Sequence, residues 1–592
     1  MAQFELGSDR SKVVNLGSLL KRRGFFWPSF EIYGGVSGFY DLGPLGSQLM
    51  ENIERAWKEK FLIEEGFMLV DGPSLAPEIV FRSSGHLSEF TDVMTKCKGC
   101  ATPFRADHLV IDLVKDAGTL SLEEMGRAIL GNKVRCPSCG GELSPPEEFN
   151  LMFKTHIGPG TDKIVYLRPE TAQTIFMDFP LLYRTNRERM PFGVGQMGRG
   201  FRNEISPRQG LLRQREFRMA EGEFFYDPAE KGFPPFKRYR DLKVMLLPNI
   251  GGEETFLSNL GDAVKEGTIG SEILAHFMGA TYSFVGSLGI PPEQMRFREH
   301  RTNEMAHYAR DCWDLEVMTS FGWVEMVGIA DRSAYDLDQH SIGSGQVLKA
   351  MRRFQTPKKV RTLKVKADMK MLGPVFKGEA KTVGDAVSSL DPGSVREALE
   401  RSQDLKVLID GTEVMVPSKA ISLVETEETL SGEWYTPHVV EPSFGLDRLM
   451  VAVLEHSYHE EAKKGMDEEE DAEDEGPYRY LRFLPSIAPV KVGVLPLMNR
   501  EPLAAMAAEI DTELRTAGMQ TFHDASGSIG RRYARMDEIG TPFCVTVDFD
   551  SPDGRDVTIR ERDTGAQRRV RMTALKDALI GLLDGTRSMS EL

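Results

Sequence analysis

A charged stretch between residues 198 and 225 holds the side-chain types that bind nucleotides. Six arginines and four glutamates lie there among apolar residues, a mixture that neither a buried strand nor a solvated face requires. Two antiparallel strands joined by a short loop would place Arg202 and Glu204 on one face. A guanidinium can hold a phosphate with two hydrogen bonds, and a carboxylate can accept one from an adenine amino group. Phe217 could then stack on the base while Arg213 reaches a terminal phosphate. The alternative is a hairpin of exposed cross-strand ion pairs.

The chain has six cysteines, which are too few for a disulfide scaffold in a chain of this length. Four of them fall into two Cys-x-x-Cys pairs. The pairs are Cys97 with Cys100 and Cys136 with Cys139. Four thiolates can surround one zinc ion tetrahedrally and leave no open position, so the expected site is structural and lies in an insertion spanning 97–143. Four unrelated buried thiols are the alternative. Cys312 and Cys544 stand alone and are expected in the core.

The segment 44–65 has the pattern of an amphipathic helix, and a strand follows it at 67–70. Its apolar residues recur every four positions, which places them on one helical face. They are Leu45, Leu49, Ile53, Trp57 and Phe61. This face could pack on a core or on a partner chain.

Three further segments differ in composition from the rest of the chain. The first, 354–428, has short alternating apolar runs around a helical stretch and is expected to be an insertion domain. The second, 462–477, contains eight acidic residues among the nine from Asp467 to Glu475, so we expect a disordered loop. In the third, 490–592, strands and helices alternate over the length of a small α/β domain.

Length and charge bound the class of protein. A chain of 592 residues should hold three or four domains. Its net charge of −16 argues against nonspecific nucleic-acid binding, although a local basic surface can still hold a phosphate backbone. Neither a membrane-spanning stretch nor a secretory signal is present. We therefore expect a cytoplasmic protein with no membrane association and no DNA partner.

Two short motifs point to nucleotide sites that the surrounding sequence does not support. Gly193-Val-Gly195-Gln-Met-Gly198 matches the dinucleotide fingerprint, but the residues after it form a charged strand pattern and not a helix. His156-Ile157-Gly158 hints at a class I synthetase signature, but the chain has no KMSKS-like partner. A GxxxxGK[ST] phosphate loop is also missing. Any ATP site must therefore use side chains.

The order FRNE then RQREF resembles motif 2 of the class II aminoacyl-tRNA synthetases, and the chain also has sequences similar to motifs 1 and 3, in the same order. Motif 1 corresponds to about 28–72, motif 2 to about 195–226 and motif 3 to about 438–458. The resemblance implies an α+β fold: a class II antiparallel-sheet catalytic core over 1–489, with insertions, followed by an α/β anticodon-binding domain over 490–592.

Longer motifs resemble the dimeric glycyl-tRNA synthetases of the archaeal and eukaryotic branch. They are YLRPETAQ, FRNEISPRQGLLRQREFRMAE, VGIADRSAYDL and EPSFGLDR, and the resemblance covers nearly the whole chain. In the last motif Ser443 stands where the generic motif 3 has glycine. The resemblance implies an aminoacyl-tRNA ligase that activates glycine with ATP and transfers it to tRNA(Gly).

The resemblance also implies roles for individual residues in ATP binding. Arg202 would hold the α-phosphate and the substrate carboxylate, Glu204 the adenine, Phe217 the purine face, and Arg213 and Arg448 the γ-phosphate. Arg202, Glu204 and Arg448 are the expected catalytic residues. Others expected beside the nucleotide are Asn203, Gln214, Glu325 and Met326. Glu325, with Glu441 assisting, would hold Mg²⁺ on the phosphates.

Glycine has no side chain to recognise, so its pocket must exclude larger amino acids by steric contact. The residues that the resemblance places around glycine are Glu170, Glu221, Arg332, Glu441, Pro442 and Ser443. It further implies a homodimer that pairs through motif 1. Arginines of the C-terminal domain are expected to contact the tRNA anticodon: Arg531, Arg532, Arg535, Arg560, Arg562, Arg568 and Arg569.

Two alternative functions remain. One is a non-catalytic class II synthetase-like protein that binds nucleic acid, although such a protein should have lost its phosphate-binding arginines. The other is a class IIa synthetase for threonine, proline, serine or histidine.

Overall fold

The computed structural model describes residues 10–592 except 112, 115–116, 118–119, 161–162, 208, 250–253, 302–304, 306–307, 402, 410–411 and 462–476. The chain divides into two compact units. One contains Met1–Leu348 and Thr436–Leu592, and the other is Lys349–Tyr435. The expected acidic loop at 462–477 lies almost entirely outside the described residues. None of the described helices is long and apolar enough to span a membrane.

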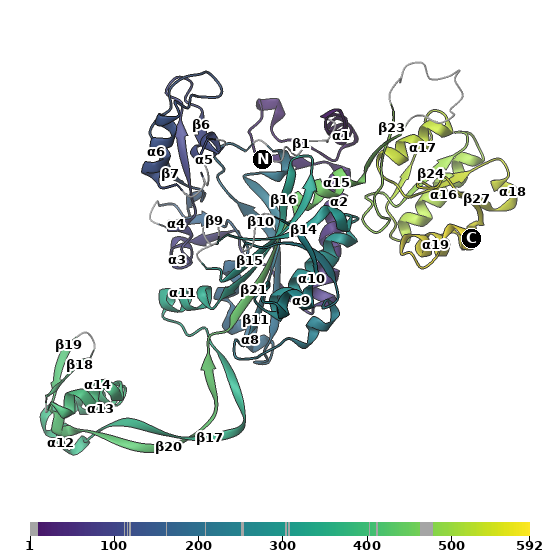
Figure 1. The fold of residues 1–592 in the computed structure, drawn as a ribbon. Coiled ribbons are helices and arrows are strands. Elements are labelled where there is room, and N and C mark those ends of the chain that lie inside the picture. The colour runs from purple at the N-terminus through teal and green to yellow at the C-terminus, as the bar shows by residue number, and fades with distance from the viewer. Residues whose placement is uncertain are drawn as a thin grey trace. The chain divides into compact units, whose positions relative to one another are not determined.

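A nine-stranded, mostly antiparallel sheet forms the centre of the first unit (Figure 1). Its strands, in spatial order, are β13 (Phe256–Asn259), β12 (Lys243–Leu247), β14 (Met295–Glu299), β15 (Asp311–Thr319), β16 (Gly322–Ser333), β21 (His438–Gly445), β11 (Glu216–Tyr226), β10 (Phe192–Phe201) and β3 (Met68–Val70). Parallel pairing occurs between β12 and β14 and between β10 and β3. This order brings β16, β21 and β11, which are distant in sequence, together at the middle of the sheet.

Three helices cover one face of this sheet and share its largest apolar core. They are α2 (Pro44–Lys58), α10 (Glu272–Ser287) and α15 (Leu446–Ser457). The expected helix over 44–65 is α2 followed by a π-helical turn, Glu59–Glu64. Its residues Leu49, Ile53, Trp57 and Phe61 are fully buried in this core. The apolar face that we expected to form a dimer contact is therefore occupied by the chain's own sheet and helices.

The GxGxxG match lies within β10, as its strand-like surroundings indicate. Each glycine leaves space for a side chain that packs against the strand. A Cβ on Gly193 would lie 2.3 Å from the Phe67 ring, and one on Gly198 would lie 2.1 Å from Nη2 of Arg168. These glycines are required by close packing in the core and not by a dinucleotide phosphate.

Short helices cover the other face near the middle of the sheet (Figure 1). They are α3 (Glu78–Ser83), α4 (His86–Glu89), α7 (Ala172–Met177), α8 (Phe179–Thr185) and α11 (Tyr335–Ser344). Strand β4 (Leu75–Pro77) pairs with β9 (Ile164–Leu167), which pairs with β8 (Lys154–His156). The remaining small elements are α1 (Arg10–Arg23), β1 (Phe26–Pro28), β2 (Tyr40–Leu42), α9 (Leu260–Lys265), β22 (Tyr458–Glu461) and β23 (Tyr478–Leu481).

The cysteine-containing segment forms a small three-stranded sheet with its own apolar cluster. Its elements are β5 (Thr91–Lys96), β6 (Pro103–Arg105), α5 (Ala106–Val110), α6 (Leu122–Gly131) and β7 (Glu147–Asn150). A capping box of Ser121 and Glu124 begins α6.

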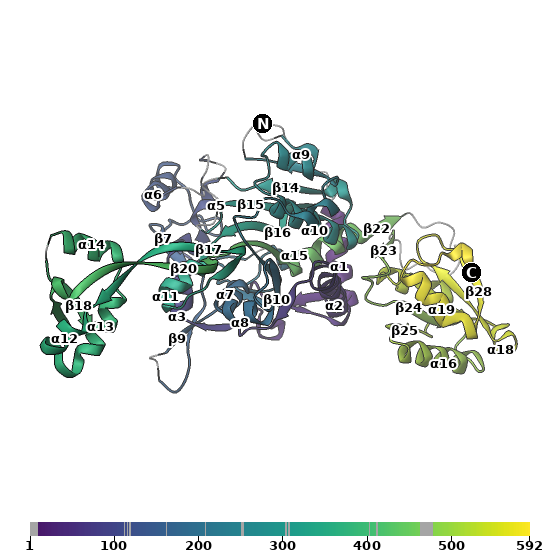
Figure 2. The ribbon, with the colours of Figure 1, turned by 90° about the horizontal axis from the view of Figure 1, so that it is seen from below.

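The second unit, Lys349–Tyr435, contains the segment in which we expected an insertion. A long antiparallel ribbon of β17 (Ala350–Ala367) and β20 (Ile421–Tyr435) leads to three helices and a hairpin (Figure 2). These are α12 (Met369–Phe376), α13 (Ala380–Ser388), α14 (Pro392–Glu400), β18 (Leu405–Ile409) and β19 (Thr412–Val416). They enclose a separate apolar core.

The C-terminal segment is an α/β domain around a five-stranded sheet, in the order β25-β24-β26-β27-β28. Its elements are β24 (Val492–Pro496), α16 (Leu503–Thr516), β25 (Thr521–His523), α17 (Ile529–Glu538), β26 (Phe543–Val547), α18 (Ser551–Gly554), β27 (Asp556–Glu561), β28 (Gln567–Arg571) and α19 (Met572–Leu583). Strands β25, β24 and β26 are parallel, as the alternation of strands and helices indicates.

Candidate active site

The residues that we expect to bind the nucleotide meet at the centre of the large sheet. The β10–β11 hairpin pairs Gly200 with Phe217 and Phe201 with Glu216, so Arg202, Glu204 and Arg213 lie in the loop that connects the two strands. Eight of the nine residues expected beside the nucleotide line one pocket: Arg202, Glu204, Arg213, Gln214, Phe217, Glu325, Met326 and Arg448. The ninth, Asn203, donates its backbone N–H to the carbonyl of Leu151 at 2.7 Å.

Arg202 is held by two aromatic rings. Its guanidinium carbon lies 5.2 Å from the Phe90 ring centre and 5.3 Å from the Phe217 ring centre. Its buried Nε has no hydrogen-bond partner among the described residues. Cation–π contact orients a guanidinium without using its N–H donors. Arg202 is therefore placed to donate to an anion.

Two ion pairs connect the other charged residues of this pocket. Arg213 Nε donates to Glu204 Oε2 at 2.9 Å, and Arg448 Nη1 lies 3.1 Å from Glu325 Oε2. Arg448 also donates to the backbone carbonyls of Leu212 and Glu325, at 3.2 and 3.0 Å. These contacts hold both arginines in place before a nucleotide arrives.

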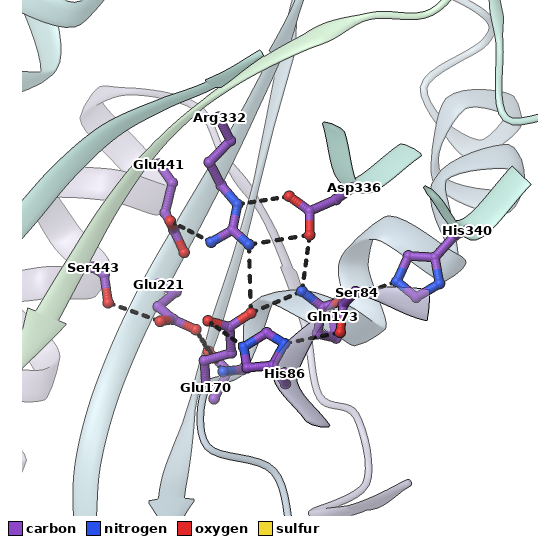
Figure 3. Close-up of polar contacts among 11 residues, drawn as sticks. Ser84, His86, Glu170, Gln173, Glu221, Arg332, Asp336, His340, Glu441 and Ser443 are labelled. Carbon is purple, nitrogen blue, oxygen red and sulfur yellow. Dashed lines mark hydrogen bonds and ion pairs between the residues drawn. The ribbon is translucent and has the colours of Figure 1, made fainter. Parts of the chain in front are cut away.

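A cluster of buried carboxylates adjoins this pocket (Figure 3). At its centre Arg332, 1% exposed, donates to Asp336 Oδ2 at 2.8 Å and to Glu441 Oε2 at 2.7 Å. Its Nη2 lies 3.5 Å from Glu170 Oε1. The Tyr308 ring stacks against the guanidinium, with 3.7 Å between the ring centre and the guanidinium carbon. Arg332 is thus a structural counter-ion for three acids, contributed by α7, α11 and β21 or the residues next to them.

Glu221 is engaged by the protein on both oxygens. Oε2 accepts from the backbone N–H and the hydroxyl of Thr171, at 2.5 and 2.6 Å, and Oε1 accepts from the Ser443 hydroxyl at 2.7 Å. Ser443 also lines the nucleotide pocket. It therefore connects the nucleotide pocket to the carboxylate cluster. Its neighbour Pro442 pairs with Ile329 across β21 and β16.

The surroundings shift the pKa values of three carboxyl groups of the cluster in different directions. Burial, strengthened by Glu221 and Glu170, raises the pKa of Glu441 to about 8 although Arg332 opposes it. Burial and the neighbouring Glu170 also raise the pKa of Glu221. For Glu170 the burial effect is outweighed by His86 and Arg332, so its pKa falls well below the usual range. Of these three acids, Glu170 is the one whose ionised form is favoured by its neighbours.

Sequence reasoning missed several residues of this cluster. Glu223 is fully buried, and neither of its carboxyl oxygens has a hydrogen-bond partner among the described residues. Burial and Glu441 raise its pKa well above the ordinary value. The alternation of β11 could have revealed Glu223, because it follows Glu221 by two positions and so faces the same side. Gln173 and Asp336 lie within the motifs YLRPETAQ and VGIADRSAYDL, which could have pointed to them, whereas His86 carries no comparable local signal.

The four cysteines of the two pairs converge, with their sulfur atoms within 4.8 Å of one another. The Sγ atoms of Cys97 and Cys139 are 3.4 Å apart, and those of Cys100 and Cys136 are 3.6 Å apart. Tetrahedral zinc–thiolate bonds would separate sulfurs by about 3.8 Å. The backbone N–H groups of Gly99 and Cys100 point to Cys97 Sγ at 3.3 and 3.4 Å. This set fits a metal ion that takes four thiolates.

Most arginines expected to contact the anticodon have structural partners instead. Arg532 and Arg562 are 3% and 7% exposed and donate to backbone carbonyls, so the expectation is wrong for these two. Three others are paired with acids of the same domain: Arg535 with Asp524, Arg560 with Asp537, and Arg569 with Asp548. Arg531 and Arg568 are exposed.

Comparison with known proteins identifies the two parts of the larger unit. Residues 491–582 match the family model of an anticodon binding domain. The prolyl-tRNA synthetase of Giardia lamblia, solved with prolyl-adenylate, has a similar fold, with a TM-score of 0.50 at 12% identity over 96% of this chain and 76% of that one. The expected class II synthetase fold with a C-terminal anticodon-binding domain is confirmed.

Curated relatives match the chain over nearly its whole length. The glycine–tRNA ligase of Methanothrix thermoacetophila is 46% identical over 97% of both chains. That of Archaeoglobus fulgidus is 44% identical, also over 97% of both. That of Methanocaldococcus jannaschii is 43% identical over 95% of this chain and 97% of the relative. The expected resemblance is confirmed, and the chain belongs to the glycine–tRNA ligase family.

Proposed function

We propose that the chain activates glycine with ATP to glycyl-adenylate and then transfers glycine to the 3′ end of tRNA(Gly). One observation carries the proposal beyond family membership: Ser443 lines the nucleotide pocket and also donates to Glu221 of the carboxylate cluster. An ammonium held among the carboxylates would thus lie beside a phosphate held by the arginines. That is the arrangement needed for a carboxylate to attack the α-phosphate.

In the first step the chain positions the reactants and stabilises charge, and no covalent enzyme intermediate is needed. Arg202, with its unpartnered Nε, holds the α-phosphate and the substrate carboxylate. Arg213 and Arg448 bind the γ-phosphate. On nucleotide binding, Arg213 gives up part of its ion pair with Glu204, and Arg448 part of its ion pair with Glu325. Glu204 then accepts from the adenine amino group while Phe217 stacks on the purine. Glu325, which lines the pocket, would hold Mg²⁺, and the ion would supply positive charge to the phosphates.

The selection of glycine follows from the fixed position of Glu221, because both of its carboxyl oxygens accept hydrogen bonds from the protein. Because Thr171 and Ser443 fix both of its oxygens, this side chain cannot move aside to admit a β-methyl group. A fixed wall excludes larger amino acids by steric overlap, which discriminates better than one missing methylene, worth about 1–3 kcal/mol. Glu170 supplies the negative charge for the ammonium, and Glu441, Pro442 and Arg332 complete the pocket.

The overall reaction is tested by charging tRNA(Gly) with labelled glycine. We expect ATP-dependent formation of acid-precipitable glycyl-tRNA and its loss in Arg202→Ala. The matched control Arg199→Ala removes a half-exposed arginine of the neighbouring strand, paired with Glu216, and should retain activity. No charging by the unmodified chain would reject the proposal.

The four thiolates between Cys97 and Cys139 support a structural zinc ion in the small sheet. A closed set of four thiolates leaves no position for substrate. The ion would fix the two cysteine pairs against each other and so hold the turn between β5 and β6. This turn contacts the loop that carries the nucleotide-binding residues, because the Ser206 hydroxyl donates to the carbonyl of Pro103 at 2.8 Å.

A homodimer is part of the proposal, but on a different surface from the buried face of α2. The loop after β1 exposes a cluster of apolar side chains within seven residues: Phe30, Ile32, Tyr33 and Val36 are 53%, 87%, 86% and 50% exposed. Clusters of this kind mark association surfaces. Sedimentation should give a dimer at micromolar concentration that Ile32→Asp with Tyr33→Asp converts to monomer.

The C-terminal domain supports recognition of the tRNA anticodon, with glycine, ATP and tRNA(Gly) as the substrates. Exposed Arg568 on β28 and exposed Phe549 after β26 supply a cation and an aromatic face for unpaired bases. The cytoplasmic location that we expected remains a prediction.

A further inference from the structure

Two buried side chains, Gln173 and His86, contact the carboxyl group of Glu170 and support its ionised form. Its Oε1 accepts from Gln173 Nε2 at 2.8 Å, and its Oε2 lies 3.4 Å from Nε2 of His86. Both Glu170 and His86 are almost fully buried, at 7% and 4% exposed. A buried carboxylate is costly unless an opposite charge or several donors face it. His86 is thus part of the reason that Glu170 can carry a charge.

The orientation of the His86 ring is fixed from its other side. Ser84 Oγ lies 2.8 Å from Nδ1, and the rings of Phe81 and Phe90 pack against the imidazole with centres 6.0 Å away. When one ring nitrogen is held by a neighbour, the other points in a defined direction. Here Nε2 points to Glu170 (Figure 3).

A second arm of the same network holds Gln173. Its Nε2 also donates to Asp336 Oδ1 at 3.0 Å, and its Oε1 lies 2.7 Å from Nε2 of His340. Figure 3 shows the polar contacts running from Ser84 through His86 and Glu170 to His340. Segments α4, α7 and α11 are therefore linked at the floor of the carboxylate cluster.

We propose that His86 is a positioning residue for glycine recognition: oriented by Ser84, its imidazole holds the Glu170 carboxyl group in place as the partner of the substrate ammonium. This inference rests on the proposed function. It also gives two acids different roles: Glu221 excludes larger amino acids by steric contact, and Glu170 binds the substrate ammonium.

The charged and titratable groups around this pair come from every element packed against it. Arg332 of β16 and His86 of α4 favour the ionised Glu170. Burial and the charge of Glu170 raise the pKa of Glu221 on β11 and of Glu441 on β21. From α11, Asp336 and His340 face the pair through Gln173, which contacts both of them and Glu170. Loss of His86 should therefore raise the pKa of Glu170. The acid limb of the pH profile of kcat/KM for glycine should then move to higher pH.

The test compares His86→Gln with a matched control. His276→Gln removes another buried histidine that is paired with a glutamate: on α10, Nε2 of His276 lies 2.7 Å from Oε2 of Glu65. Glycine-dependent ATP–pyrophosphate exchange is measured from pH 5 to pH 9. In His86→Gln we expect KM for glycine to rise about tenfold or more, KM for ATP to stay unchanged, and the acid limb to shift upward. His276→Gln should change neither KM nor the limb.

An unchanged glycine KM and acid limb in a folded His86→Gln would overturn the inference, as would an equal rise in both KM values. If that variant does not fold, Ser84→Ala decides: a smaller rise confined to glycine supports the role, and wild-type behaviour overturns it. Failure of the proposed function is distinguishable, because the unmodified chain would then show no glycine-dependent exchange.

Discussion

Ser443 and Glu221 are direct partners on neighbouring strands, with their Cα atoms in register and a 2.7 Å hydrogen bond between their side chains. The serine stands where the general class II motif has glycine. In the proposed glycine pocket its hydroxymethyl group would fill space beside Glu221, and its hydroxyl holds that carboxyl group. The volume of Ser443 and the carboxyl group of Glu221 can therefore be removed separately by mutation.

Changing Ser443 to glycine should relax selection by removing volume, whereas changing Glu221 to alanine should remove the carboxyl group that forms the wall and leave the Thr171 donors unpaired. We expect Ser443→Gly to lower the glycine-to-alanine ratio of kcat/KM by about tenfold with little loss of rate for glycine. For Glu221→Ala the rate with glycine should also fall, by about 10- to 100-fold. Pyrophosphate exchange with glycine and L-alanine measures both effects. An unaltered ratio in both variants would mean that neither residue lines the amino-acid pocket.

Glu223 provides a prediction about pH and stability. Its pKa in the folded chain is raised well above 4.5, so the unfolded chain ionises this group first as pH rises. The stability that the neutral acid contributes is present below the unfolded pKa and is lost as pH rises toward the folded pKa, at about 1.4 kcal/mol per pH unit. Glutamine mimics the neutral acid and does not titrate.

Glu223→Gln should therefore gain free energy of unfolding relative to the unmodified chain as pH rises from 5 to 8. Denaturant unfolding at the two pH values measures this difference, and Glu216→Gln on the same strand, half-exposed and paired with Arg199, is the matched control. A Glu223→Gln variant that is less stable by the same amount at both pH values would contradict the neutral assignment.

The metal site predicts one zinc per chain. Elemental analysis of freshly purified, reduced protein should find one equivalent, and Cys136→Ser should lose it together with several degrees in Tm. Cys544→Ala, at a lone buried thiol, should keep the zinc. Protein without zinc under these conditions would refute the assignment.

Arginines of the C-terminal domain should separate into two groups. Arg568→Ala, at an exposed position, should raise KM for tRNA several-fold and leave glycine-dependent exchange unchanged. Arg532→Ala, at a buried guanidinium that serves backbone carbonyls, should instead destabilise the domain by about 1–3 kcal/mol. Charging kinetics and thermal unfolding distinguish these effects. Equal effects of both variants on exchange would show that the domain supports the catalytic core structurally.

How far the sequence predicts the site depends on whether the information is local. Arg202, Glu204, Arg213 and Phe217 lie in one hairpin whose pattern is visible in the sequence, and the structure places them around one pocket. The two cysteine pairs are similarly local. In contrast, the contact of His86 with Glu170 joins residues that are far apart in the chain. Glu170 lies in the motif YLRPETAQ, but nothing next to His86 signals its role.

Burial is the other property that the sequence pattern left open. The apolar face of α2 was compatible with a core or with a partner, and only the packing of Trp57 and Phe61 against the sheet decides for the core. Similarly, the composition of the C-terminal domain cannot reveal that Arg532 and Arg562 are buried. Both cases depend on which surfaces meet in the folded chain, and apolar periodicity or net charge does not specify this.

The central claim is that one site activates glycine and excludes larger amino acids. ATP–pyrophosphate exchange with the unmodified chain and a panel of glycine, alanine, serine, threonine, proline and histidine tests it most directly. We predict exchange with glycine, and rates with each of the other amino acids lower by at least about 100-fold. Exchange that is fastest with another amino acid, or no exchange with any of them, would contradict it.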